Sequence, residues 1–323
     1  MKFTDRYGEF MKGQKEKVPA VQLNNLKAVL HSCEIKDMRS KDRNTGVCDS
    51  PQDCPVCDGT FFPSLLKDMS VIVNFFNKRA KKLLNSHLAS GFKKYILRLK
   101  RKLKLKGSHA NMIKEAQDLV AYATITTFAV QKILKKYDKV HCSKKGQRFK
   151  LEAQTMHLEL LKSPWLLELM AFHINMRKTE MKARLFGFDC SLHIDDEDRA
   201  LFLVNLSDSI KLNLDLTCPI CLDTVFDPVS LTCSHILCHM CASSVAAVTI
   251  VDGLQASASE KKCPICRQGG VFGGAVHLHE LSMLLSRSVP KYWKERLRRE
   301  RQERIKQAKE HWESQCRTFL GYE

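Results

Sequence analysis

The residues with the clearest chemistry are cysteine and histidine side chains between positions 218 and 266. They form four pairs, of which three have the spacing Cys-x2-Cys and one reads Cys-x-His. Two such side chains can face one tetrahedral Zn²⁺ from a tight turn, so four pairs are enough for two ions. The sequence therefore predicts two zinc sites, built from Cys218, Cys221, Cys233, His235, Cys238, Cys241, Cys263 and Cys266.

Two other interpretations of these cysteines fit less well. A disulfide framework needs an oxidising compartment, and nothing in the sequence indicates one. Buried cysteines placed by chance would not keep four pairs in register. His239 is left over by the assignment, and we expect it to face solvent.

The order of the ligands, with a single histidine in fourth place, resembles the RING finger of ubiquitin ligases. The resemblance implies crossed sites, in which the first and third pairs share one zinc ion and the second and fourth pairs share the other. It also implies a platform without a nucleophile of its own, which holds a ubiquitin-conjugating enzyme and its ubiquitin thioester in place for attack by a substrate lysine. The contact positions of the family correspond to Ile220, Pro264 and Arg267.

Plainer interpretations of these three residues stay open at this point. Ile220 and Pro264 could simply pack around the zinc, and Arg267 could be an ordinary surface charge. The loop from Ala242 to Lys262 also lacks the tryptophan or other large apolar residue that many active members have before the last pair.

Length and charge narrow the class of protein. A chain of 323 residues suggests two domains or three modules, and its net charge of +18 favours an anionic partner. No apolar run approaches the length of a membrane span, and the first residues do not resemble a signal peptide. We therefore expect an intracellular protein of the cytoplasm or nucleus without a transmembrane segment.

Hydrophobic periodicity predicts a mostly helical chain. A helical hairpin is expected over 1–34, a loop over 36–58, and long helices over 62–88, from 92 onward and over 111–140, with a break at Gly107-Ser108. Residues 151–187 also look helical with a break at Pro164, 187–200 look like an acidic turn, and 290–313 like a charged helix. Cys33, Cys48, Cys54 and Cys57 could form a third zinc site, but free thiols are the better interpretation.

Basic residues gather in the first half of the chain. Between Met69 and Lys114 there are thirteen lysines and arginines and no acidic residue. Further along, Lys132, Lys135, Lys136 and Lys139 fall within an arc of about 100° on a helix whose opposite side is apolar. Lysines so close together repel each other, which lowers the stability of the helix, and a bound anion would remove this repulsion.

Several stretches of this half together resemble an SPX domain, a helical bundle that binds inositol polyphosphates and pyrophosphates. They are Met1-Lys-Phe, Phe61-Phe-Pro-Ser-Leu-Leu66, Val73-Asn-Phe-Phe76 and, most specifically, Lys132-Ile-Leu-Lys-Lys-Tyr-Asp-Lys139. The resemblance implies that ligand phosphates contact Lys27, Lys132, Lys135, Lys136 and Lys139, with Lys2 as an additional residue. Leu23 stands where the family usually has an aromatic residue, so one phosphate contact is lost.

The order of SPX followed by RING resembles the plant ubiquitin ligases of the nitrogen-limitation-adaptation, or benzoic-acid-hypersensitive, family. The stretches from Cys54 to Leu66 and from Leu216 to Asp223 carry this similarity. It implies a ligase that links phosphate status to the turnover of phosphate or nitrate transporters, and that reaches the plasma membrane through these substrates.

The expected fold is mainly α, with an SPX helical bundle (1–150), a helical connector and acidic linker (151–210), a small α/β cross-brace RING finger (211–270), and a turn with a charged C-terminal helix (271–323). Two alternatives to an active ligase remain. One is a non-catalytic SPX/RING scaffold. The other is a basic zinc protein that binds nucleic acid through Lys93–Lys106, which the zinc spacing disfavours.

Overall fold

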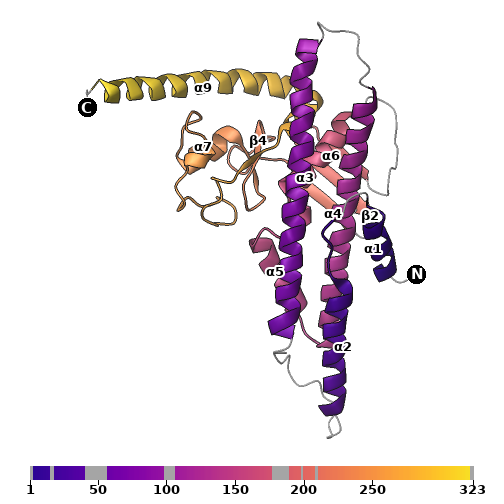
Figure 1. The fold of residues 1–323 in the computed structure, drawn as a ribbon. Helices are drawn as coiled ribbons and strands as arrows, with labels where there is room; N and C mark the ends of the chain where they lie inside the picture. Colours follow the sequence, from indigo (N-terminus) through magenta and orange to yellow (C-terminus); the bar gives the residue numbers. More distant parts are fainter. Residues whose placement is uncertain are drawn as a thin grey trace. The chain divides into compact units, whose positions relative to one another are not determined.

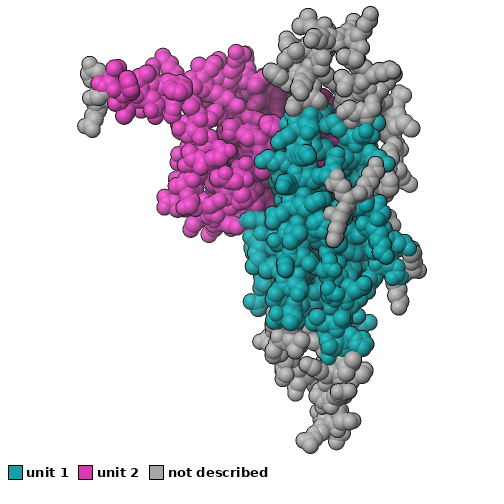
Figure 2. Space-filling model, viewed as in Figure 1, with its two compact units in different colours: residues 1–166 teal, residues 167–323 magenta. Residues whose placement is uncertain are grey.

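The structure is a computed structural model, and it describes residues 3–14, 18–40, 57–97, 106–176, 189–197, 199–207 and 210–320. The chain divides into two compact units, residues 1–166 and residues 167–323 (Figure 2). Each unit has its own buried core, and each is described below by itself. In the described part of the chain, no helix combines the length and the apolar character needed to cross a membrane.

All the regular elements among the described residues of unit 1 are helices or helical turns (Figure 1). Two long helices, α3 and α4, contact each other, and α1 and α2 pack on α4. The elements of the unit are α1 (Phe3–Lys12), α2 (Leu23–Ser40), a π-helical turn η1 (Cys57–Phe61), α3 (Phe62–Leu97), α4 (Lys106–Val140), α5 (Lys145–Thr155), a 3₁₀ turn η2 (Leu160–Lys162), and the first residues of α6 (Pro164–Met176).

The core of unit 1 is aromatic and aliphatic, and its buried tyrosines make specific polar contacts. The Tyr7 hydroxyl accepts a hydrogen bond from the Val21 amide at 2.8 Å, and the Tyr122 hydroxyl donates to the Pro19 carbonyl at 2.7 Å. These two bonds satisfy buried hydroxyl groups and hold the segment before α2 against α1 and α4. The largest fully buried side chains of the unit are Phe61, Phe76, Tyr122, Tyr137, Leu26, Leu30, Leu65, Ile72 and Leu84.

The helices of unit 1 are longer than the sequence predicts. α3 continues without interruption to Leu97, so the expected second helix from residue 92 is the end of α3. α4 begins at Lys106 and contains Gly107 and Ser108 in its first turn, so the predicted break there is wrong. A helical glycine costs only about 1 kcal/mol, which the rest of such a long helix readily offsets.

The connection from α4 to α5 depends on a glycine. The Gly146 amide donates to the Asp138 carboxylate at 2.7 Å, which fixes the start of α5 against the end of α4. A Cβ at this position would lie 2.8 Å from the Leu134 carbonyl oxygen, so only glycine fits without a shift. The predicted break at Pro164 is the start of α6, where proline is well tolerated.

Unit 2 opens with an antiparallel sheet in the order β1-β2-β3, formed by β1 (Asp189–Ile194), β2 (Ala200–Ser207) and β3 (Ile210–Asp215). The prediction of an acidic turn over 187–200 is therefore wrong for most of its described residues. Only the segment between β1 and β2 is a turn, and there Asp195 accepts hydrogen bonds from the Glu197 and Arg199 amides. The alternation of apolar and polar residues over 201–216 corresponds to β2 and β3.

The remaining elements of unit 2 surround the cysteine pairs. A second small antiparallel sheet has the order β5-β4-β6, with β4 (Pro228–Ser230), β5 (Ile236–Cys238) and β6 (Val276–His277). The helices are α7 (His239–Ala246), a 3₁₀ turn η3 (Leu254–Ala256), α8 (His279–Ser288) and α9 (Pro290–Phe319). The charged helix expected over 290–313 is confirmed and extends to Phe319.

A buried carboxylate joins two helices of unit 2. Glu168 of α6 is 2% exposed and accepts hydrogen bonds from the Glu280 and Leu281 amides, at 2.9 and 3.0 Å. These are among the first N–H groups of α8, which have no partner within the helix. Burial raises the pKa of Glu168 to about 8, so the contact is made by a carboxyl group that holds its proton near neutral pH.

Candidate zinc centres and basic surface

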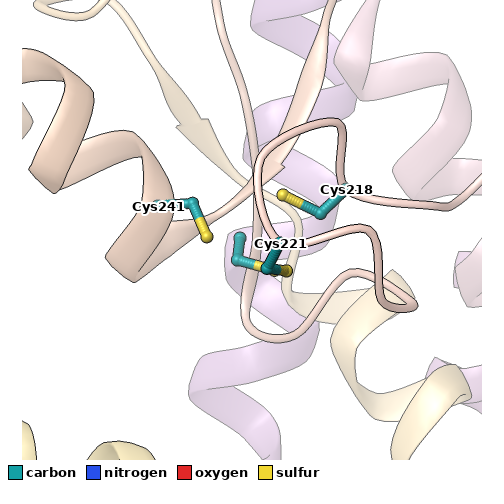
Figure 3. Close-up of side chains that lie close together, drawn as sticks. Cys218, Cys221 and Cys241 are labelled. Carbon is teal, nitrogen blue, oxygen red and sulfur yellow. The ribbon is translucent and has the colours of Figure 1, made fainter.

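The first cluster brings together Cys218, Cys221, Cys238 and Cys241. The first two lie on the loop that follows β3, Cys238 ends β5, and Cys241 lies in the first turn of α7 (Figure 3). The Cys221 and Cys238 sulfur atoms are 3.7 Å apart, much too far for a disulfide. Two thiolates on one tetrahedral zinc ion, with Zn–S of about 2.3 Å, would lie about 3.8 Å apart.

The second cluster brings together Cys233, His235, Cys263 and Cys266. The His235 Nδ1 atom lies 3.4 Å from the Cys233 sulfur and 3.7 Å from the Cys263 sulfur. A nitrogen and a sulfur ligand of one tetrahedral zinc ion would be about 3.6 Å apart, from the usual Zn–N and Zn–S lengths. The two clusters therefore pair the ligands in the crossed order, and their donor sets suit two zinc ions.

The first cluster also shows why a cation would stabilise it. Hydrogen bonds from the Cys238 and Cys241 thiols lower the pKa of Cys218 far below its ordinary value, which favours a thiolate at that sulfur. Several sulfur atoms at such short range cannot all be deprotonated without mutual repulsion. A bound Zn²⁺ would supply the compensating positive charge and would hold the loops of this small module together.

The first and last cysteine pairs form two turns of the same kind. In the first, the Leu222 amide donates to the Cys218 carbonyl at 2.8 Å, and in the second the Arg267 amide donates to the Cys263 carbonyl at 2.9 Å. Leu222 and Arg267 both adopt left-handed backbone conformations, with φ of 61° and 60°. Each turn leads its two cysteines to one cluster and leaves the residue after the second cysteine exposed.

The residues expected to contact a conjugating enzyme lie on these two turns. Ile220 is 41% exposed, and Pro264 and Arg267 are exposed as well. The interpretation that Ile220 and Pro264 pack around the zinc sites does not agree with this exposure. Two further exposed apolar side chains lie on the same turns, Leu222 and Ile265, and the sequence analysis did not single them out.

Helix α9 braces the first turn, a role that the sequence analysis did not assign to it. The Arg296 guanidinium donates to Asp223 at 2.9 Å and to Glu300 at 2.9 Å. The Trp293 ring lies 4.4 Å from the ring of Phe226, and the Tyr292 hydroxyl donates to the Thr224 carbonyl. The signal in the sequence was the pair of aromatic residues at the start of an otherwise highly charged helix.

The structure places His239 in a different environment from the one that the sequence predicts. It is only 9% exposed, so the prediction of a histidine facing solvent is wrong. The Nδ1 atom lies 3.5 Å from an oxygen of Asp227, and the ring lies 4.4 Å from that of His277 in an edge-on arrangement.

In unit 1, the predicted lysine stripe lies on the surface of α4. Lys132, Lys135 and Lys139 are exposed, while Ile133 and Tyr137 are buried on the opposite side. The Lys132 ammonium lies 4.5 Å from the centre of the Phe3 ring, and Lys27 of α2 donates to the Thr4 hydroxyl. Lys27 and Lys132 therefore meet at the first turn of α1.

Some predicted residues lie outside the described part of the structure. Lys2 is one of them, and so are Cys48 and Cys54. The side chains of Cys33, Cys57 and the whole Lys93–Lys106 segment are likewise outside it. Their predicted roles stay predictions.

Comparisons with known proteins agree with the geometry of the clusters. Residues 218–266 match the family model of the C3HC4-type zinc finger, the RING finger. The chain is 54% identical over 326 residues to the probable E3 ubiquitin-protein ligase BAH1-like 1 of Oryza sativa subsp. indica, covering 99% of this chain and 100% of the relative. It is 51% identical over 336 residues to the E3 ubiquitin-protein ligase NLA of Arabidopsis thaliana, with the same coverage. No solved structure matches the chain significantly.

The fold and the site thus define a RING-type ubiquitin transferase. The similarity extends over nearly the whole length of the relatives, and a further Arabidopsis protein, the probable E3 ubiquitin-protein ligase BAH1-like, is 39% identical over 338 residues. The chain belongs to the BAH1/NLA family of plant E3 ubiquitin-protein ligases.

Proposed function

We propose that the protein holds a ubiquitin-loaded conjugating enzyme on the two exposed turns of the RING finger and so promotes transfer of ubiquitin to a substrate lysine. The observation that carries this proposal is the exposure of Ile220, Pro264 and Arg267 on turns whose cysteines belong to the zinc clusters. When a partner covers an isoleucine that a rigid turn holds at the surface, the burial of its apolar area stabilises the complex.

Each of the three residues has a distinct part in this proposal. Ile220 is the apolar anchor, and Pro264 lies beside it in the contact without losing conformational entropy. Arg267 contacts both the conjugating enzyme and ubiquitin, because its planar guanidinium can donate to two carbonyl groups at once. No residue of this chain forms a covalent bond with ubiquitin, so the rate gain comes from orientation of the thioester.

The first test measures binding of the full-length, zinc-loaded protein to a panel of ubiquitin-conjugating enzymes. Ile220→Ala should weaken the best-bound enzyme at least about tenfold, as for a central interface residue. Ile305→Ala is the matched control, because Ile305 is 60% exposed and belongs to α9 and to neither turn. Equal affinities for the two variants and the wild type would exclude the proposed contact.

We further propose that the lysine stripe of α4, together with Lys27 and Lys2, binds an inositol polyphosphate or pyrophosphate. Support comes from Lys27 and Lys132, which approach the same turn of α1 from two different helices, and from the exposure of Lys135 and Lys139 beside them. Lys136, on the same stripe, is half-buried. A ligand with several phosphate groups would relieve the repulsion among these ammonium groups, and its affinity should fall as salt is added.

Calorimetry with inositol hexakisphosphate tests the second proposal. Lys135→Ala should weaken binding several-fold, whereas Lys114→Ala should leave it unchanged. Lys114 is an exposed lysine of the same helix, about 32 Å away from Lys135 along its axis. Equal loss in both variants would show that only the total charge matters, and no binding by the wild type would remove the site.

In the full proposal, unit 1 also recruits the substrates, which are membrane transporters for phosphate or nitrate, and the ligand reports phosphate status. The protein would act in the cytoplasm and nucleus and would meet the plasma membrane through these substrates. Ubiquitin transfer to a transporter segment in a reconstituted reaction distinguishes such a ligase from a non-catalytic scaffold. A scaffold would not support the transfer.

A further inference from the structure

A third cluster of ligand-type side chains lies beside the zinc sites and belongs to neither. It consists of Asp227, His239 and His277, whose nearest ligand atoms all lie within 4.8 Å of one another. The sequence analysis left His239 without a function, and its burial makes it more than a surface histidine.

The backbone holds the three residues at one end of the sheet β5-β4-β6. Asp227 directly precedes β4, His239 directly follows β5, and His277 pairs with Val229 across β4 and β6. The His239 amide donates to the Asp227 carbonyl at 3.1 Å. Three separate segments of the chain are therefore fixed around one point before any side chain contributes.

The distances at this point suit a small cation better than a hydrogen bond. The His239 Nδ1 atom is buried and has no hydrogen-bond partner in the structure, although an Asp227 oxygen lies 3.5 Å away. A nitrogen and an oxygen ligand of one tetrahedral zinc ion would be about 3.3 Å apart. A buried ring nitrogen without a partner is costly, and a metal ion between it and the carboxylate would remove the cost.

The charges around the cluster also leave room for a cation. Arg304 donates to Asp227 at 2.6 Å and approaches Glu300 at 3.4 Å, and Arg296 pairs with Glu300 and Asp223, so two guanidinium groups face three carboxylates. Carboxylates that bind metals are commonly held by such a hydrogen bond.

We propose that Asp227, His239 and His277 bind a third zinc ion, with the fourth position taken by water. Two imidazole nitrogens and one carboxylate oxygen form a donor set that zinc accepts readily. The ion would join β4, the start of α7 and β6, and thus add a cross-link at the end of the sheet. It does not depend on the roles proposed above for Ile220 or for the lysine stripe.

The test is the zinc content of the full-length protein after dialysis against a buffer of fixed micromolar free zinc, measured by mass spectrometry against protein concentration. The wild type should hold three ions per chain and His277→Gln two. His279→Gln is the matched control, because this exposed histidine stacks on His277 at 5.6 Å but is not part of the cluster; it should retain three.

Three results would overturn the proposal. Two ions in the wild type would mean that the cluster holds none, and a third ion that persists in both His277→Gln and Asp227→Asn would be bound elsewhere on the surface. If His277→Gln holds fewer than two ions, its fold has been disturbed and Asp227→Asn is measured instead, because asparagine keeps the shape of the aspartate side chain. The proposal predicts two ions in Asp227→Asn, and three ions would contradict the site. As a second readout, added zinc should raise the Tm of the wild type above that of His277→Gln.

Discussion

Arg267 and Leu222 show how a turn determines the exposure of single residues. Both follow the second cysteine of a pair, both have a left-handed backbone, and both turns close with the same hydrogen bond to the first cysteine. A non-glycine residue in this conformation costs about 1 kcal/mol or more, which the metal-bound turn must offset. The gain is a side chain held away from the core, where a partner can reach it.

The buried carboxyl group of Glu168 gives a pH dependence that can be predicted with its sign. Burial raises its pKa to about 8, whereas in the unfolded chain it titrates near 4.5. The folded protein therefore binds this proton more tightly, and the stability contributed by the group is present at low pH and lost as the pH rises through about 8.

Glu168→Gln should remove this dependence, because an amide mimics the protonated acid at every pH. The difference in Tm, Glu168→Gln minus wild type, should increase between pH 6 and pH 9. Glu303→Gln, at an exposed position of α9, is the control, and the pH dependence of its Tm should be the same as that of the wild type. Parallel curves for Glu168→Gln as well would show that Glu168 is ionised in the folded protein.

At the scale of elements, α9 is more than a solvated charged helix. Its first turns pack on the RING module through aromatic residues, and the buried Glu300 accepts from Arg296, which in turn holds Asp223. The alternation of charges along the helix could be recognised in the sequence. The sequence could not show which of these charged residues contact the RING module, because those contacts depend on how the start of α9 packs in the tertiary structure.

Glu300 should therefore matter more for stability than its neighbours on α9. Glu300→Ala removes a partner of both Arg296 and Arg304 at a position that is 7% exposed, and should cost about 1–3 kcal/mol in the free energy of unfolding. Glu313→Ala, on the exposed end of the helix, should cost less than about 0.5 kcal/mol. Denaturant unfolding of the zinc-loaded protein compares the two, and equal costs would contradict the bracing role of α9.

Much of the fold could be predicted from residue patterns, and the failures have physical causes. The long helices, the paired ligands and the lysine stripe all have strong periodic or spacing signals. The sheet β1-β2-β3 was missed because a run of acidic residues over 195–198 dominated a segment that is mostly strand. One helix break was predicted at Gly107-Ser108, which lie in the first turn of α4, and a new helix was predicted to begin near residue 92, which lies within α3.

The candidate site was predictable to a similar degree. Each pair of ligands is visible in the sequence because its two members lie close together, and the crossed order in which the pairs combine was implied by the resemblance to the RING finger. The buried position of His239 could not be predicted in the same way, since Asp227 and His277 reach it from two other segments of the chain. Contacts of that kind become visible only when the strands are placed side by side.

At the scale of the whole molecule, the two units have separate cores and should respond differently to loss of metal. Removal of zinc by a strong chelator should unfold the RING module, whose loops the two clusters hold together, and leave most of the helical circular dichroism of unit 1. The Trp293 ring packs on Phe226 inside unit 2, so its fluorescence should shift to longer wavelength.

Trp293→Phe is the control for this experiment, because it removes the reporter and should abolish most of the shift. Trp165 belongs to unit 1 and should respond little. A loss of helical signal as complete as in denaturant would show that unit 1 depends on zinc as well, and that the two units do not fold separately.

Ubiquitin transfer by Arg267→Ala tests the central claim most directly. Full-length protein would be mixed with ubiquitin, activating enzyme and the conjugating enzyme that it binds best, and chain formation would be followed together with zinc content. The account predicts that Arg267→Ala keeps its RING zinc but loses at least about tenfold in rate, and that Arg267→Lys does not restore it. Arg299→Ala, an exposed arginine of α9, should match the wild type. Full activity of Arg267→Ala with zinc retained would contradict the proposed mechanism.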